Sequence, residues 1–332
     1  MRSPGAPWLY CETDDDHQLR STFHHPGFGA MTGIVIPSLG GRHLVRCLEG
    51  VAGLDPAPRR TVVVVSGSAA LQARSSANEE YLEFDHRLGF AAAVNAGIAH
   101  LGDEITRVAL LNDDAVPAPG WLAPLESALD ADPKLAAVQG TVTDSLGAVI
   151  DGRGIILDET GLPAQVDRGA TPPPEPPGPQ PRVAVSGTAS LYRVRARRET
   201  ALAEGSNFDR GFGNYHEDLD IGLRMRRLGW EAAWVPGAWA SHVGSATGYR
   251  LGWRHPWWLL TNHWRALAGN LTAAALFAAL PTLLRGEIRA VHTLAIDNPR
   301  ALPTAAAALA CIPWIVVRSL GRTSPGPRLY SL

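Results

Sequence analysis

Two short runs of apolar, mostly β-branched residues, GIVIP at 33–37 and TVVVV at 61–65, constrain the fold of this chain more than any other feature. Both are apolar throughout, which is typical of parallel strands that are buried on both faces. Between them, four apolar residues recur at helical spacing within 43–51. These three segments predict a βαβ unit, and therefore an α/β sheet whose ligands bind beyond the carboxyl ends of the strands.

The same alternation continues along the chain. The sequence predicts helices over 90–101 and 121–129, and apolar strands over 107–111 and 136–142. A further helix is predicted over 217–229, because acids fill its first turn, arginines its last turn and a glycine follows.

One proline-rich segment, TPPPEPPGPQPR at 171–182, interrupts this pattern. So many prolines exclude a core strand or helix and predict an exposed, polyproline-like loop. Because strand-like sequence resumes at 183, the loop is interpreted as an insertion within one domain.

Composition narrows the class of protein. With 332 residues, 45% of them hydrophobic, the chain can bury the core of one large domain with an appendage. The formal net charge of −2 gives no basic field, so a nucleic-acid partner is not expected. Three widely spaced cysteines give no zinc or disulfide pattern and favour a reducing compartment. We expect a loose extension over 1–30, a main domain over 31–248 and a helical region over 249–332.

Candidate metal ligands follow the strand at 107–111. In extended chain, Asn112 and Asp114 point the same way, so both can reach one ligand, with Asp113 between them. A hard cation such as Mg²⁺ takes oxygen ligands and leaves positions for phosphate oxygens and water. The alternative is an acidic turn that only ends a strand.

A second acidic cluster, Glu217, Asp218 and Asp220, begins the helix predicted at 217–229. One acid there can serve as a helix cap, but three within four residues favour a catalytic role, since a carboxylate can take a proton from an attacking hydroxyl. His242 follows an apolar strand pattern and is a candidate metal ligand, although a lone histidine is more often simply packed.

Taken in order, five segments resemble the family-2 glycosyltransferases with a GT-A fold, especially the bacterial rhamnosyltransferase-like branch. They are IVIPSLGGRHLVRCLEGV, LGFAAAVNAGI, LLNDDAVPAPGWL, SGTASLYRV and FDRGFGNYHEDLDIGLRMRRLGWEAAWVPGAWASHVGSATG, which together span about 32–248. The resemblance implies an α/β fold of GT-A type, with a Rossmann-like mixed, mainly parallel sheet flanked by helices and a helical C-terminal region.

The resemblance also implies roles for single residues. Asp114 would be the metal-binding acid and Asp218 the catalytic base, with Glu217 beside it and His242 joining the metal or diphosphate site. Asn112 stands at the first acid of the family's metal turn, with Asp113 next to it. The other positions implied to contact the nucleotide are Pro37, Ser66, Gly89 and Asn95.

Two positions depart from the family pattern. Ser66 stands where the family usually carries an aspartate that contacts the nucleotide, and Arg87 stands where an asparagine is common. The sequence therefore leaves the nucleotide and the sugar open.

The C-terminal region favours a bilayer surface. YRLGWRHPWWLL at 249–260 interleaves cations and aromatic rings, a mixture suited to the headgroup layer. Proline interrupts the apolar runs at 271–284 and 301–317, and both runs are shorter than the roughly twenty residues that span a bilayer. We expect peripheral attachment; the alternative is that these helices complete the core.

The function expected from these features is inverting transfer of a sugar from a nucleotide diphosphate sugar donor to a sugar or lipid-linked sugar acceptor. The transfer would require Mg²⁺ or Mn²⁺ and serve cell-surface polysaccharide or glycolipid synthesis. The expected location is the cytoplasm, at the inner face of the cell membrane. A sugar-1-phosphate nucleotidyltransferase is an alternative, but GGRHLVRCL after the first strand is a poor phosphate loop. A non-catalytic carbohydrate-binding protein is the other alternative.

Overall fold

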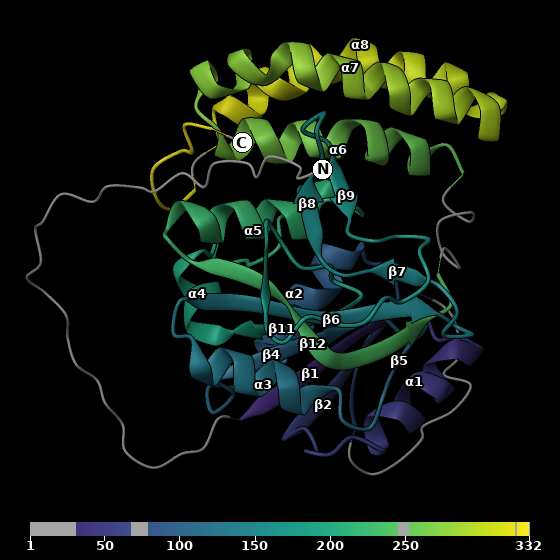
Figure 1. Ribbon diagram of the computed structural model, residues 1–332, viewed down its shortest axis with the longest axis vertical. Coiled ribbons are helices and arrows are strands. Elements are labelled where there is room, and N and C mark those ends of the chain that lie inside the picture. The colour runs from purple at the N-terminus through teal and green to yellow at the C-terminus, as the bar shows by residue number, and fades with distance from the viewer. Residues whose placement is uncertain (1–30, 68–78, 245–251, 323, 332) are drawn as a thin grey trace, which may run out of the picture.

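A mixed sheet runs through the centre of the molecule in the computed structural model, which describes residues 31–67, 79–244, 252–322 and 324–331 (Figure 1). The strands are β1 (Thr32–Ser38), β2 (Arg60–Ser66), β3 (Glu79–Phe84), β4 (Arg107–Leu111), β5 (Ala115–Pro117), β6 (Leu135–Asp144), β7 (Ile150–Gly152), β8 (Ile155–Leu157), β9 (Pro163–Gln165), β10 (Gln180–Arg182), β11 (Ala189–Arg193) and β12 (Glu231–His242). The helices are α1 (Arg42–Ala52), α2 (Phe90–His100), α3 (Leu122–Ala131), α4 (Val194–Glu199), α5 (Glu217–Arg227), α6 (Arg254–Asn270), α7 (Ala273–Asp297) and α8 (Leu302–Leu320), with short 3-10 turns η1 (Arg210–Phe212) and η3 (Pro299–Ala301).

The sheet has the order β10-β12-β6-β11-β4-β1-β2-β3, with β5 and β7 paired at its side. Strands β4, β1, β2 and β3 run parallel, as do β6 and β12, whereas β11 runs antiparallel between β4 and β6. The predicted fold class, a mixed, mainly parallel sheet flanked by helices, is confirmed.

The β-branched runs form the centre of this sheet because they bury both faces. In β1, Ile34 and Ile36 contact the layer that contains α1 and α3, whereas Val35 faces the layer that contains α2. β2 alternates in the same way, and all these side chains are essentially inaccessible to solvent. Successive side chains of a strand point to opposite faces, so an uninterrupted apolar run is what a doubly covered strand requires.

The proline-rich segment at 171–182 is less exposed than predicted. Its last three residues form β10, which pairs antiparallel with β12 at the edge of the sheet, where proline is tolerated because the ladder there needs fewer donors. The Glu175 carboxylate accepts hydrogen bonds from the Thr141 hydroxyl at 3.0 Å and the Gly237 amide at 2.7 Å. These bonds hold the segment against the sheet.

The C-terminal region is a stack of helices on the side of α5 that faces away from the sheet (Figure 1). α6 packs on α5 through a cluster that includes Leu219, Leu223, Trp264 and Leu267, and α7 and α8 cover α6. The alternative that these helices complete a core therefore holds for α6.

The prediction that proline breaks the two C-terminal apolar segments is wrong. α7 has 25 residues and continues through Pro281, and α8 has 19 and continues through Pro313. Both prolines lie on exposed faces, where water can satisfy the carbonyl that each leaves without a helical partner. In the described part of the chain, one helical segment, Pro299–Leu320, is long and apolar enough to cross a membrane by length and composition alone.

Candidate active site

The acidic turn lies at the carboxyl edge of the sheet because the fully buried strand β4 ends at Leu111. The Asn112 amide donates to the Thr188 carbonyl at 2.9 Å, and the Ala115 amide donates to the Asn112 carbonyl at 3.0 Å. These backbone bonds fix the turn, and the side chains of Asp113 and Asp114 point to different neighbours.

Asp113 points back toward β1. Its carboxylate accepts a hydrogen bond of 2.6 Å from the Ser38 hydroxyl, and burial raises the pKa of Asp113 above its ordinary value. Asp113 therefore ties the ends of β1 and β4 together.

Asp114 meets His242, which the twelve-residue strand β12 carries to the same edge. The His242 Nε2 atom lies 3.1 Å from the Asp114 carboxylate, and its Nδ1 atom lies 2.8 Å from the carboxylate of Asp151 in β7. Burial alone lowers the pKa of His242, but the hydrogen bonds to both acids outweigh it and raise the pKa to about 9.

These residues fit a divalent metal that is completed by ligands from outside the protein. The Asp114 carboxylate and the His242 Nε2 atom lie side by side and could ligate the same ion. Asp151 bonds to Nδ1 and orients the ring so that Nε2 faces the metal position, as in carboxylate–histidine–metal arrangements. No group of three or more acidic, histidine or cysteine side chains in the described residues is spaced to hold a metal ion by itself. Diphosphate oxygens and water would supply the remaining positions, which is how Mg²⁺ commonly binds.

Asp218 and Glu217 begin α5, after two residues in the left-handed conformation, Tyr215 with φ of 70° and His216 with φ of 67°. Burial raises the pKa of Asp218 to about 6, although a hydrogen bond of 2.8 Å from the Leu219 amide and the nearby Gly187 backbone act to lower it. Burial and the neighbouring Asp218 hold the pKa of Glu217 well above its usual range, and one of its carboxylate oxygens is buried without a hydrogen-bond partner.

One turn brings the two acidic clusters together. The backbone of Gly187 lies beside the Asp218 carboxylate and lowers its pKa, and the carbonyl of the next residue, Thr188, accepts a hydrogen bond of 2.9 Å from the Asn112 amide. The proposed base and the proposed metal turn therefore lie against adjacent residues of the same backbone. A Cβ at Gly187 would lie 2.7 Å from the far end of the Phe90 ring, so a larger residue here would require that ring to move.

The residues expected to contact the nucleotide have different surroundings. Pro37 and Ser66 lie at the carboxyl ends of β1 and β2, where a ligand is expected. A Cβ on Gly89 would lie 2.8 Å from the Gly213 carbonyl oxygen, so this glycine also allows close backbone packing. Asn95 is buried in α2, and its side chain bonds to the backbone of the segment that precedes η1. The amide nitrogen donates to the Phe208 carbonyl at 2.7 Å, and the amide oxygen accepts from the backbone amides of Phe208 at 3.0 Å and Asn207 at 3.1 Å.

The sequence analysis missed Asp151. It lies in a three-residue strand within an irregular stretch, and the only signal is an acid between a β-branched residue and a glycine in VIDGRG. Asp220, in contrast, is fully buried and ion-paired with Arg224 and Arg322, which makes it a structural acid.

Comparison with known proteins bears on the family and the fold. Residues 34–198 match the family described as Glycosyl transferase family 2. The match covers just under half of the chain, so this part of the sheet domain is similar to family-2 glycosyltransferases. No curated protein is significantly similar to the whole sequence.

Solved structures share the fold of this chain at low sequence identity. GalNAc-T7 with UDP, GalNAc and Mn²⁺ is 16% identical with a TM-score of 0.51, covering 64% of this chain and 43% of that one. The mannosyltransferase PcManGT from Pyrobaculum calidifontis with GDP-Man and Mn²⁺ is 20% identical with a TM-score of 0.51, covering 87% and 76%. TarS 1-349 from S. aureus is 12% identical with a TM-score of 0.51, covering 88% and 81%. The chain thus spans less than half of GalNAc-T7, and these likenesses establish the fold alone.

Proposed function

We propose that this glycosyltransferase moves a sugar from a nucleotide diphosphate sugar to an acceptor hydroxyl with inversion at the anomeric carbon, and that it requires a divalent metal. The observation that carries the proposal is the turn at 187–188, which holds Asp218 and the Asn112–Asp114 turn beside each other. A base and a site for the leaving diphosphate are the two parts that a single in-line displacement needs.

Asp114 and His242 would hold the metal, which when bound neutralises the charge that develops on the departing diphosphate. His242 must lose its proton to ligate, so binding would release the proton that it shares with Asp114 and Asp151 in the free protein. Asp151 then keeps the ring in place through Nδ1.

Asp218 would take the proton of the acceptor hydroxyl on the face opposite the leaving group. A pKa of about 6 leaves this carboxylate ionised at neutral pH and still basic enough to accept a proton. Burial and the neighbouring Asp218 also raise the pKa of Glu217 well above its usual range, so the two adjacent acids resist being ionised together.

The direct test combines product stereochemistry with matched variants. NMR of the product formed from a donor of known anomeric configuration should show the opposite configuration. Asp218→Asn should lower turnover on the order of a hundredfold or more at saturating donor, with donor affinity little changed. Asp103→Asn, an exposed acid far from the site, serves as the control. Retained configuration, or loss of donor binding with unchanged turnover, would refute the assignment.

The donor and the branch of the family are also proposals. GalNAc-T7 and PcManGT were solved with UDP and GDP-Man, each with Mn²⁺, which supports a nucleotide sugar and a divalent metal here. We assign the chain to the rhamnosyltransferase-like branch on the segment from Phe208 to 248. Thermal stabilisation by a panel of nucleotide sugars with Mn²⁺ or Mg²⁺, including a rhamnose donor, tests this, because a ligand that binds only the native state raises its apparent stability. A donor set that excludes rhamnose would reject the branch.

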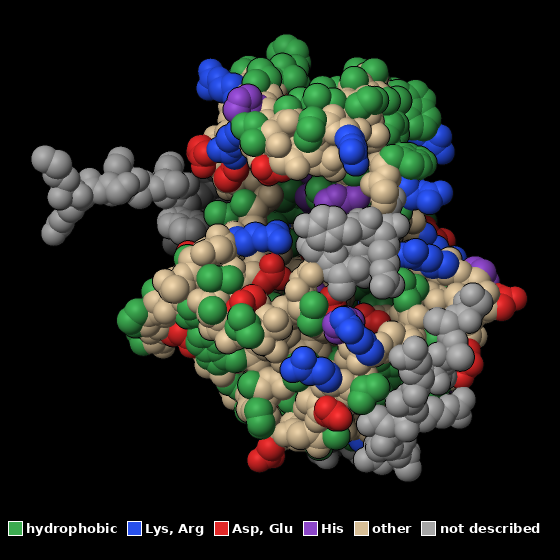
Figure 2. Space-filling view, turned by 90° about the vertical axis from the view of Figure 1, so that its right-hand side faces the viewer, with side chains coloured by type: hydrophobic (Ala, Val, Ile, Leu, Met, Phe, Trp, Pro, Cys, Tyr) green, Lys and Arg blue, Asp and Glu red, His purple; other side chains and the backbone are tan. Residues whose placement is uncertain are grey.

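We further propose that α7 and α8 rest on the cytoplasmic face of a membrane, where a lipid-linked acceptor for cell-surface glycan synthesis would be presented. Figure 2 shows hydrophobic side chains gathered at the end of the molecule formed by these helices. They include Phe277 and Ile288 of α7, 77% and 71% exposed, and Trp314 of α8, 63% exposed. An apolar face of this kind on a folded protein marks an interaction surface.

The apolar face is proposed to lie in the plane of the membrane surface. α8 packs along α6, which is itself buried against α5, so a spanning α8 would have to leave that contact. Arg318, in the last turn of α8, stacks over the exposed Trp314 ring at 5.2 Å, a pairing suited to the headgroup layer. The apolar side chains would then enter the lipid to a shallow depth.

A further inference from the structure

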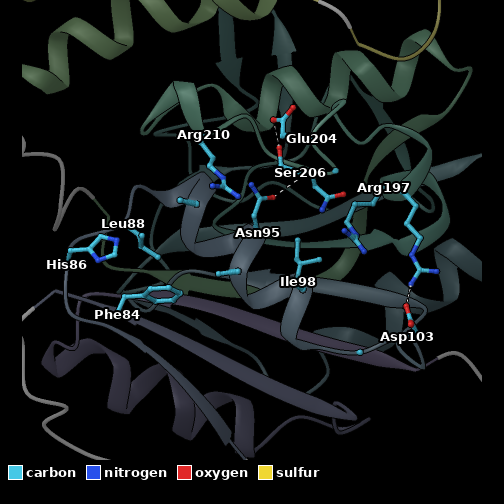
Figure 3. Close-up of a pocket in the computed structure, with 17 residues that line it drawn as sticks. Phe84, His86, Leu88, Asn95, Ile98, Asp103, Arg197, Glu204, Ser206 and Arg210 are labelled. Carbon is cyan, nitrogen blue, oxygen red and sulfur yellow. Dashed lines mark hydrogen bonds and ion pairs between the residues drawn. The ribbon is translucent and has the colours of Figure 1, made fainter.

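A cavity of about 630 Å³ runs along α2 (Figure 3). Of the candidate-site residues only Asn95 lines it, and the Asn95 amide is already bonded to the backbone of Asn207 and Phe208. Its volume lies in the range of small-molecule sites. One wall consists of apolar side chains from β3, the following loop and α2, and the opposite wall is the segment that joins α4 to η1. The apolar members are Phe84, Leu88, Ala92, Ala96, Ile98 and Ala99.

Arg197 of α4 lines this cavity with an unpaired buried charge. Only 9% of the residue is exposed, and its Nε atom is buried without a hydrogen-bond partner. Among the described residues, no carboxylate lies within ion-pairing distance of its guanidinium, whereas its neighbours Arg195 and Arg198 pair with Glu199 and Asp103. Burial and the adjacent Arg198 lower the pKa of Arg197 to about 10. Buried polar groups are normally satisfied, so an unpaired guanidinium indicates a missing anion.

The surrounding charges leave this cation uncompensated. Arg210 lines the cavity near Asn95, and in the described chain its guanidinium has no ion pair either. Glu204 also lines the cavity, and its carboxylate accepts a hydrogen bond of 2.8 Å from the Ser206 hydroxyl. Asp103 is engaged with Arg198 at 2.6 Å.

The Arg197 end of the cavity is remote from the proposed chemistry. β11 is antiparallel to β4, and its last residue, Arg193, lies opposite Arg107, where β4 begins. α4 follows at once, so Arg197 lies at the edge of the sheet opposite the Asn112–Asp114 turn. The five residues of β4 separate these edges by about 16 Å at roughly 3.3 Å per residue.

We infer that this cavity is a second ligand site, which binds a small phosphate monoester with an apolar body. Its phosphate pairs with Arg197, and its apolar part lies on the Leu88–Ile98 side of α2. Guanidinium binds phosphate by paired, charge-assisted hydrogen bonds, and the apolar wall adds burial that a free phosphate ion cannot use. The inference does not depend on the proposed transfer reaction.

The test measures binding of phenyl phosphate to the full chain by calorimetry in excess EDTA, so that a metal-dependent diphosphate site stays empty. One equivalent should bind, inorganic phosphate should bind more weakly, and phenol should not bind measurably. Arg197→Gln should weaken phenyl phosphate about tenfold or more, because a charged partner is lost. Arg195→Gln, an exposed arginine on the same helix, is the matched control and should bind as the unmodified chain does.

Each contrary outcome has a definite meaning. No binding of phenyl phosphate to the folded, unmodified chain at millimolar concentration would overturn the inference. Equal affinity in Arg197→Gln, with circular dichroism showing a folded protein, would place the anion elsewhere and also overturn it. Equal affinity for phenyl phosphate and inorganic phosphate would refute the apolar part of the site.

Discussion

At the scale of single residues, the environment of Asp218 is predicted to set the pH dependence of the proposed transfer reaction. The base must be ionised to accept a proton, and burial raises its pKa to about 6. We expect kcat/KM to fall about tenfold per pH unit below pH 6 and to level off above it. The residual activity of Asp218→Asn should lack this limb. A profile of kcat/KM from pH 5 to 8 at saturating metal checks this, and a flat profile would contradict the role of Asp218.

Asp151 is predicted to act on the metal through His242. Its carboxylate lies 2.8 Å from Nδ1 and fixes the ring that would ligate through Nε2. Asp151→Asn should weaken Mn²⁺ binding about 10- to 100-fold, because removing a hydrogen-bond partner of a ligand has this effect at other metal sites. Titration of Mn²⁺ by electron paramagnetic resonance measures it. Asp167→Asn, at an acid that pairs with Arg153, is the control, and equal loss in both variants would make the effect non-specific.

The candidate site residues that the sequence could place are those at the ends of regular elements. Asp114 follows a strand, so local pattern places it at the carboxyl edge of the sheet, whereas Asp218 was placed only at the start of a helix. Asn95 also sits in a predicted helix, but the direction of its amide depends on the distant backbone of Asn207 and Phe208. Asp151 depends on β7 pairing with β6, a contact that no periodicity in its three residues announces.

At the scale of elements, α5 carries two acids with opposite effects on stability. Burial raises the pKa of Asp218, so its ionisation costs folding free energy as pH rises from about 4 to 6. Burial acts likewise on Asp220, but Arg322 and Arg224 outweigh it and hold its pKa below the usual range. Asp220 therefore stabilises the fold above its unfolded-state pKa, and that contribution is lost as pH falls through the lower, folded-state pKa.

Two isosteric substitutions separate these effects. At pH 7.5, Asp218→Asn should raise the free energy of unfolding, whereas Asp220→Asn should lower it by roughly 3 kcal/mol or more, because it breaks a buried ion pair. At pH 4 the gain from Asp218→Asn should largely vanish. Urea denaturation at both pH values measures the difference in the free energy of unfolding. Destabilisation by Asp218→Asn at pH 7.5 would contradict the proposed cost of ionising buried Asp218.

The helices and strands also divide into those that hydrophobic pattern predicted and those that it missed. β1, β2, β4 and their helices followed from hydrophobic pattern, because buried strands and amphipathic helices carry their own periodicity. β10 was missed because its pairing comes from β12 and not from the propensity of Gln180–Arg182. The C-terminal helices ran longer than predicted since proline was treated as a stop, although a proline on an exposed face can be accommodated.

At the scale of the whole molecule, the C-terminal region is joined to the sheet domain by polar as well as apolar contacts. Arg322 pairs with Asp220 and, at 2.9 Å, with Asp209, and Arg227 of α5 donates to the Pro327 carbonyl at 2.9 Å. In α6, the Asn262 side chain donates to the carbonyls of Phe212, Asn214 and Tyr215, residues that precede α5. Since α7 and α8 pack on α6, these contacts connect both helices to the residues at the start of α5.

The membrane proposal predicts reversible attachment. Full-length protein should pellet with vesicles that contain anionic lipid, less so at high salt, and alkaline carbonate should release it, because an interfacial helix gains affinity from shallow apolar burial and from cations near anionic headgroups. Replacing the most exposed apolar side chains, Phe277→Ser with Ile288→Ser, should weaken pelleting and leave activity on a soluble acceptor unchanged. The double variant Ala306→Ser and Ala307→Ser changes two small, exposed residues of α8 and serves as the control.

Two results would decide against this arrangement. Retention in the vesicle pellet after carbonate treatment would mean that Pro299–Leu320 crosses the bilayer, since only a spanning segment resists that extraction. Full-length protein that remains in the supernatant with every vesicle composition would instead assign the apolar face of α7 and α8 to a protein partner. Reversible pelleting that depends on Phe277 and Ile288 is the outcome that the exposed apolar face predicts, because removing buried apolar area weakens interfacial binding in proportion.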